Sequence, residues 1–186
     1  MNRLEETYLL LVLKELKTVG RYRLSAILQK PEGAVRGILR RYRQRGMIVS
    51  KPKKGVSLTA KGLQKLNRLL SDLSIRKTQV IKGKMLGVGP ENVLLHIKNR
   101  GHQVKLGVEQ RDAAVAAGAR GALILVYKNR ILSLPGVYRD IARDLGLERN
   151  LLGGIHTSEN DVLAVSFAEA WWKAMRGGIA IAESLS

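Results

Sequence analysis

The chain of 186 residues is long enough for one medium-sized domain or two small ones, and its 45% hydrophobic content is typical of a globular protein. It has no cysteine, which excludes disulfides, zinc ribbons, iron–sulfur clusters and thiol catalysis. Its 33 lysines and arginines against 15 acidic residues give a net charge of +18. Such an excess indicates a polyanionic partner such as nucleic acid, or alternatively a generally basic proteome.

The positive charge is concentrated near the N-terminus. Residues 1–77 contain 19 basic and 5 acidic residues, a net of +14, whereas residues 78–186 contain 14 and 10, a net of +4. A basic proteome would spread the charge evenly, so the distribution favours a dedicated binding module. The apolar run 8–13 is too short to span a bilayer and follows two glutamates. We therefore expect no membrane segment, no signal peptide and a cytoplasmic location.

The first part of the chain has the expected order helix, helix, helix, hairpin, helix. Apolar residues at helical spacing predict helices over 3–17, 22–28, 31–45 and 59–73. Pro31 suits the start of the third helix, Gly46 its end and Thr59 the N-cap of the fourth. Two short strands, 47–51 and 56–58, flank the basic Pro/Gly turn and predict a hairpin.

The composition changes after a short polar junction at 74–77. Beyond it the chain is richer in glycine, alanine and β-branched residues. Their pattern predicts strands over 79–86, 93–98, 122–127 and 131–134, and helices over 108–117, 138–145 and 159–176. Ser158 is the expected N-cap of the last helix. We therefore expect two domains, a mainly α domain with a β-hairpin over 1–74 and an α+β domain over 78–186.

The third helix carries an arginine face. Arg36, Arg40 and Arg43 stand at i, i+4 and i+7, turned away from an apolar stripe. A helix with one core face and one arginine face suits insertion into the major groove, where arginine pairs with guanine or phosphate. Gly33 and Gly37 lie near the same surface and would let the helix approach a duplex closely.

The hairpin turn adds a second basic cluster. It consists of Lys51, Lys53 and Lys54. Lysine is a point charge suited to phosphate rather than to base recognition. Either cluster alone would be typical of a solvated face, but a basic helix and a basic hairpin occur here where one fold would present them together.

These segments resemble the winged-helix family of transcription regulators. The resemblance rests on residues 23–28 for the second helix, 33–42 for the recognition helix, 45–49 leading into the wing, and the Leu-Thr-x-x-Gly motif within 58–63 at its exit. It implies a homodimeric transcriptional regulator that binds double-stranded DNA. The helix 31–45 would lie in the major groove and the wing 51–55 on the backbone.

The second half resembles the uncharacterised C-terminal domain of a group of archaeal winged-helix proteins, which implies no activity. We expect it to bind a small effector or to dimerise. An Ala-rich helical stretch after Arg111 and Asp112 permits close helix–sheet packing, and a crevice there could use Arg100 or Arg111 as an anion anchor. His156 would belong to a polar pocket edge, although a simple helix start is the favoured explanation of its neighbours.

Residues for catalysis, metals or cofactors are not indicated. The three histidines, His96, His102 and His156, lack metal-ligand spacing, and the glycine pairs at 87–89 and 153–154 lack the context of a phosphate loop. We expect no enzyme, no metal and no cofactor. Two alternatives stay open. One is a bifunctional enzyme with a winged-helix regulatory domain, as in some archaeal riboflavin kinases and biotin ligases. The segment 134–137 is the nearest to the nucleotide-binding segment of such a kinase, but it lacks the threonine that would hold a nucleotide and metal. The other is a non-specific DNA-, RNA- or chromatin-binding protein.

Overall fold

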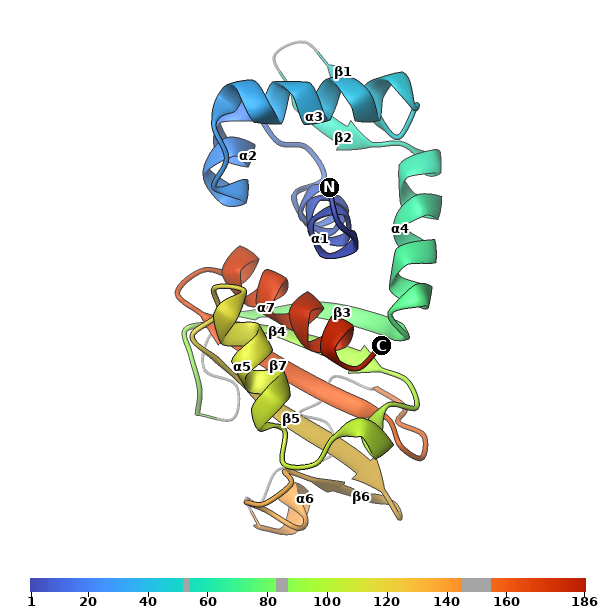
Figure 1. Ribbon diagram of the computed structural model, residues 1–186, viewed down its shortest axis with the longest axis vertical. Helices are drawn as coiled ribbons and strands as arrows, with labels where there is room; N and C mark the ends of the chain where they lie inside the picture. Colours follow the sequence, from blue (N-terminus) through green and yellow to red (C-terminus); the bar gives the residue numbers. More distant parts are fainter. Residues whose placement is uncertain (52–53, 83–86, 145–154) are drawn as a thin grey trace. The chain divides into compact units, whose positions relative to one another are not determined.

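The computed structural model describes residues 1–51, 54–82, 87–144 and 155–186 (Figure 1). The chain divides into two compact units, Met1–Leu70 and Ser71–Ser186, here named the first and second unit. The division falls inside α4 (Ala60–Asp72). The polar junction expected at 74–77 is wrong, because β3 (Ile75–Lys82) already begins there. Ser74 supplies the turn between them in a left-handed conformation, φ 56°.

The first unit has the element order expected from the sequence. It contains α1 (Arg3–Leu16), α2 (Arg21–Leu28), α3 (Glu32–Gln44), β1 (Ile48–Lys51), β2 (Gly55–Leu58) and most of α4. Local signals account for the helix ends. Gly46 follows α3 with φ 69°, and the Thr59 hydroxyl accepts from the N–H of Gly62 at 3.1 Å and donates to the Gly46 carbonyl at 2.7 Å.

Two tyrosines tie the helices of the first unit together. The Tyr8 hydroxyl donates to the carbonyl of Ile27 at 3.2 Å, which joins α1 to the end of α2. The Tyr42 hydroxyl donates to the Glu6 carboxylate at 2.9 Å, which joins α3 to α1. Burial, followed by this hydrogen bond, raises the pKa of Tyr42 far above its usual range. Tyr42 therefore remains a neutral donor, and α3 is held with a fixed face toward the core.

The hairpin has an additional partner in the α1–α2 connection. β1 and β2 pair antiparallel, with Ile48 opposite Leu58 and Lys51 opposite Gly55. On its other side β2 forms a bridge through Val56 with Val19. Three chain segments thus lie side by side, and the hairpin is anchored at a residue that precedes α2.

The second unit contains a five-stranded antiparallel sheet in the order β3-β4-β7-β5-β6. Besides β3 its elements are β4 (Glu91–Ile97), η1 (Gly101–Gln103), α5 (Val108–Ala116), β5 (Gly121–Lys128), β6 (Ile131–Ser133), α6 (Ile141–Asp144), β7 (Val162–Ala168) and α7 (Trp171–Ser184). Helices α5 and α7 pack on each other and on one face of the sheet (Figure 1). The expected α+β class is confirmed.

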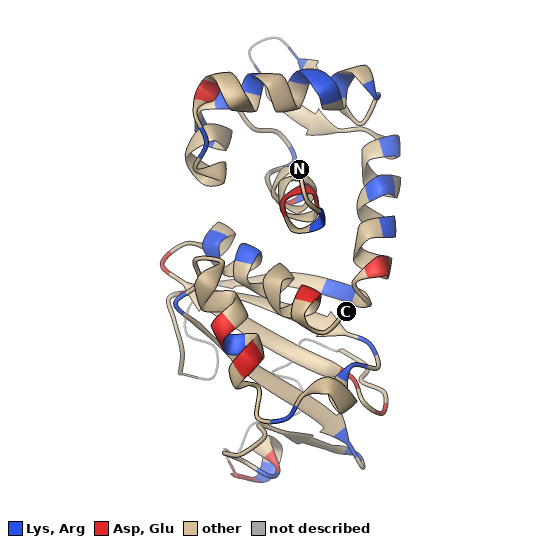
Figure 2. Ribbon diagram, in the orientation of Figure 1, with Lys and Arg blue, Asp and Glu red and all other residues tan. Residues whose placement is uncertain are grey.

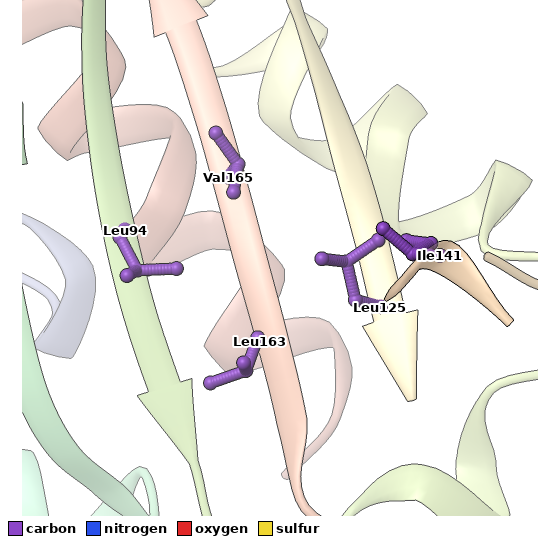
Figure 3. Close-up of a cluster of buried hydrophobic side chains, with 5 residues drawn as sticks. All are labelled: Leu94, Leu125, Ile141, Leu163 and Val165. Atoms are coloured by element: carbon purple, nitrogen blue, oxygen red, sulfur yellow. The ribbon is translucent and has the colours of Figure 1, made fainter. Parts of the chain in front are cut away.

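The opposite face of the sheet carries a buried hydrophobic cluster. Leu94 of β4, Leu125 of β5, Leu163 and Val165 of β7 and Ile141 of α6 form it (Figure 3). Glycine allows close packing on the helical face, since a Cβ on Gly178 of α7 would overlap the Leu95 side chain. Because both faces are covered, the central strands β4 and β7 are apolar throughout rather than alternating.

The prediction of one helix over 159–176 is wrong. Residues 162–168 form the central strand β7, and the last helix begins only at Trp171. Ser158 therefore caps no helix; its N–H donates to the Asp161 carboxylate in the turn before β7. The helix expected over 138–145 is reduced to α6 within the described residues, and the strand expected over 79–86 begins at Ile75, with 83–86 outside them.

Candidate nucleic-acid interface

The basic face of α3 is exposed while its apolar stripe is buried. Val35, Ile38, Leu39 and Tyr42 lie in the core. Arg36, Arg40 and Arg43 are exposed, and Figure 2 shows basic residues along the length of α3. The burial of one side of α3 therefore determines that the arginine side faces solvent.

A groove of about 570 Å³ lies between α3 and the hairpin. It is lined by Arg21, Arg36, Leu39, Arg40, Arg43, Ser50, Lys51, Gly55 and Val56. Five of these nine residues are cationic, none is acidic, and Leu39 and Val56 contribute an apolar floor. Concave surfaces lined by one sign of charge focus the electrostatic potential, so this groove favours a polyanion.

The remaining predicted residues of this surface lie beside the groove. Lys54 is exposed on the hairpin turn, and Lys53 lies outside the described residues. Gly33 and Gly37 do not line the groove, but a Cβ added at either would meet no atom within 4 Å. The glycines thus leave open space along the exposed side of α3.

Two residues of this surface are not among those expected from the sequence. Arg21, the first residue of α2, lines the groove, and no local pattern places it beside α3. Glu32 Oε1 lies 3.4 Å from Nη2 of Arg21 and 3.3 Å from Nη2 of Arg36. The i, i+4 spacing of Glu32 and Arg36 was a signal that could have found this pair.

Arg40 and Arg43 differ from Arg36 in having no acidic partner. Within the described part of the chain, neither arginine forms an ion pair or a side-chain hydrogen bond. Their guanidinium groups keep all of their donors available for a ligand. The α3 surface therefore presents one arginine held by a carboxylate and two that are not.

The four candidate ligand residues of the second unit lie in three separate parts of the chain. Arg100 is half-buried and donates to the Ser74 hydroxyl through Nε and Nη2, at 3.3 and 3.2 Å. Arg111 and Asp112 pair with each other on exposed α5 at 2.9 Å, and His156 is exposed ahead of β7. No hydrogen bond or ion pair in the described ranges joins these elements through the four side chains.

The second unit instead contains a buried His–Asp pair. His96 Nε2 lies 2.6 Å from Asp161 Oδ2, and the two side chains are 2% and 1% exposed. Asp161 also accepts from the N–H groups of Ser158 and Asn99, at 2.9 and 3.0 Å. Burial acts to raise the pKa of Asp161, but the hydrogen bonds from Ser158, His96 and Asn99 outweigh it and lower the pKa below 3.8. The ionised carboxylate therefore joins β4 to the start of β7.

Metal and membrane features are absent from the described residues. Over the described ranges, no three histidine or acidic side chains lie close enough together to hold a metal ion. No helix in those ranges combines the length and apolar character needed to cross a bilayer.

Comparison with known proteins places the chain without assigning an activity. A solved structure of the hypothetical protein PH0730 from Pyrococcus horikoshii OT3 superposes with a TM-score of 0.73 at 25% identity, covering 100% of this chain and 92% of that one. Both units therefore have counterparts in that protein. No curated protein matches the chain. The family model described as a domain of unknown function, DUF4443, matches residues 88–185. This match spans more than half of the chain, and the protein belongs to the DUF4443 family.

Proposed function

We propose that this protein is a DNA-binding transcriptional regulator whose first unit is a winged helix. The observation that carries the proposal is the groove between α3 and the hairpin, with its five cations and no acidic lining residue. Double-stranded DNA presents closely spaced phosphates, and a protein that neutralises them gains affinity by releasing counterions.

The topology of the first unit supports the winged-helix assignment. Three helices are followed by a hairpin and a fourth helix, and the α1–α2 connection pairs with β2 through Val19 and Val56. In this arrangement α3 is the recognition helix and the β1–β2 hairpin is the wing. Helix-turn-helix proteins insert the second helix of the motif in the major groove, and here α2 and α3 pack on each other as such a pair.

The basic residues of the proposed interface fall into two groups, one suited to contacts with bases and one suited to contacts with phosphates. Arg36 and Arg40 stand on the helix that would enter the major groove, where arginine can pair with guanine. Lys51 stands on the wing, where a flexible ammonium can contact phosphate. The alternative of binding without sequence preference would use the same cations for phosphate alone.

The second unit would serve regulation by dimerisation rather than catalysis. Leu106 and Val137 are 63% and 66% exposed, and a Cβ on Gly136 would lie 3.1 Å from the Leu106 side chain, so Leu106 lies beside the segment that carries Val137. Exposed apolar patches favour association between proteins. A homodimer would present two copies of α3 to a twofold-symmetric site. The concentration dependence of the mass in light scattering tests this part.

The DNA-binding proposal is tested by fluorescence-anisotropy titration of labelled duplexes with the full-length protein. Arg40→Ala and Arg43→Ala should each weaken binding by about tenfold. Arg68→Ala is the matched control, since this exposed arginine of α4 lies outside the groove lining. Equal affinities for all three variants and the parent protein would contradict the proposal.

A further inference from the structure

The acidic residue beside the groove has a geometry suited to sequence recognition. Glu32 is the first residue of α3, and Arg36 follows one turn later. A single oxygen, Oε1, lies 3.3 Å from Nη2 of Arg36 and 3.4 Å from Nη2 of Arg21. Glu32 thus joins a residue of α2 to a residue of α3. Both guanidinium groups belong to the groove lining.

We propose that Glu32 is a specificity-determining residue that positions Arg36 to read a guanine. This inference rests on the proposed DNA-binding function. Arg36 has 66% of its side chain exposed, and an untethered arginine there would populate many rotamers. The Glu32 carboxylate holds one end of the guanidinium, so less conformational entropy remains to be lost on binding DNA. The other donors of Arg36 remain available for the O6 and N7 acceptors of guanine.

The position of Arg36 agrees with this role. Residues in the N-terminal part of a recognition helix contact base edges, and Arg36 is in the second turn of α3. Gly37 follows it directly and Gly33 precedes it by three residues, and both glycines have open space where a side chain would stand. The backbone of α3 can therefore approach base edges near Arg36.

The charge of Glu32 favours specificity over total affinity. A carboxylate between Arg21 and Arg36 offsets part of their attraction for any phosphate, whatever the DNA sequence. Arg40 and Arg43 have no such partner in the described part of the chain, so their charges are not offset and attract DNA of any sequence. Glu32 therefore lowers non-specific binding while it orients the side chain that reads the base.

The experiment uses a duplex selected by the full-length protein from a random pool, together with random duplexes of the same length. Affinity for both is measured for the parent protein and for Glu32→Gln, Arg36→Ala and the double variant. Glu32→Gln should lower the ratio of selected to random affinity by about tenfold, with random binding unchanged or stronger. The ratio of selected to random affinity should be no lower in the double variant than in Arg36→Ala alone.

A base analogue tests the predicted contact directly. Replacement of guanine by 7-deazaguanine in the selected duplex should weaken its binding to the parent protein but leave its binding to Arg36→Ala unaffected. Glu15→Gln is the control for Glu32→Gln, since it also removes one negative charge from the first unit but lies outside the groove lining. Thermal unfolding of each variant verifies that the first unit remains folded.

The outcomes separate this inference from the proposed function. Equal increases of selected and random affinity in Glu32→Gln, or additive losses in the double variant, would overturn the role of Glu32 while leaving DNA binding intact. A selected duplex that needs no guanine would do the same. Absence of DNA binding by the parent protein would overturn both.

Discussion

Val19 and Val56 exchange both of their backbone hydrogen bonds, at 3.0 and 2.9 Å. Val19 precedes α2 and Val56 lies in β2, so this bridge fastens the hairpin to the connection that begins the α2–α3 pair. The neighbouring Gly55 has φ 98°, and a Cβ there would lie 2.5 Å from the Val19 carbonyl oxygen. The wall that β2 contributes to the groove thus depends on a residue without a side chain.

Gly55→Ala should destabilise the first unit by about 2–4 kcal/mol, because it combines a left-handed backbone with a clash against a backbone carbonyl. Urea unfolding followed by far-UV circular dichroism measures the loss. Gly33→Ala is the control, since a Cβ at this helical position meets open space. A Gly55→Ala protein as stable as the parent would contradict the described bridge.

Gly37 offers a test that separates stability from binding. Gly37→Leu should stabilise α3 by roughly 0.5–1 kcal/mol, because glycine is a poor residue for a helix interior. The same change should weaken DNA binding at least several-fold, since the leucine would fill the open surface of α3 that we propose faces the duplex. Thermal unfolding and anisotropy titration give the two values. A more stable protein with undiminished affinity would show that α3 does not approach the duplex on this side.

Lys51 should contribute charge without sequence preference. Lys51→Ala is expected to weaken binding to selected and to random duplexes equally. It should also reduce the slope of log Kd against log salt concentration by about one. Titrations at several salt concentrations measure this slope. Lys61→Ala on exposed α4, outside the groove lining, should leave it unchanged. A loss confined to the selected duplex would instead assign Lys51 to base recognition.

Asp161→Asn should destabilise the second unit by about 1–3 kcal/mol at neutral pH, because it removes a buried carboxylate that is hydrogen-bonded to His96 and to two backbone N–H groups. The fluorescence of Trp171 and Trp172 reports urea unfolding of this unit, since both of the chain's tryptophans lie in α7. The N–H donors at Ser158 and Asn99 would face a neutral amide in place of a carboxylate.

The contribution of Asp161 to the stability of the second unit should depend on pH with a definite sign. The pKa of Asp161 is lowered in the folded state, so the unfolded chain binds the proton more readily around pH 3.8. The contribution of Asp161 is complete above that value and is lost as the pH falls through the folded-state pKa. The stability difference between the parent protein and Asp161→Asn should therefore narrow below pH 3.8. A constant difference down to acid unfolding would contradict the lowered pKa of Asp161 in the folded state.

Local signals in the sequence were sufficient for the first unit. The helical spacing of α3, the glycine after it and the threonine cap of α4 act within a few residues, and each predicted its element closely. Residues 162–168 were misassigned because a short apolar run fits a buried strand and a buried helix equally well. Only the pairing of β7 with β4 and β5 distinguishes the two.

The candidate site was predictable only in part. Arg36, Arg40 and Arg43 share a face by helical geometry alone, so the sequence placed them together. Arg21 reaches the groove because α2 packs on α3, a tertiary contact without a sequence pattern. His96 and Asp161 are 65 residues apart and meet only through the β4–β7 pairing.

Selection of genomic DNA fragments with the full-length protein, at physiological salt and in excess random competitor, would show whether this protein recognises a DNA sequence. We expect a short enriched motif containing an essential guanine, and loss of that enrichment in Arg36→Ala. Uniform recovery of fragments with a steep salt dependence and no motif would contradict it, because phosphate contacts alone would then account for all binding.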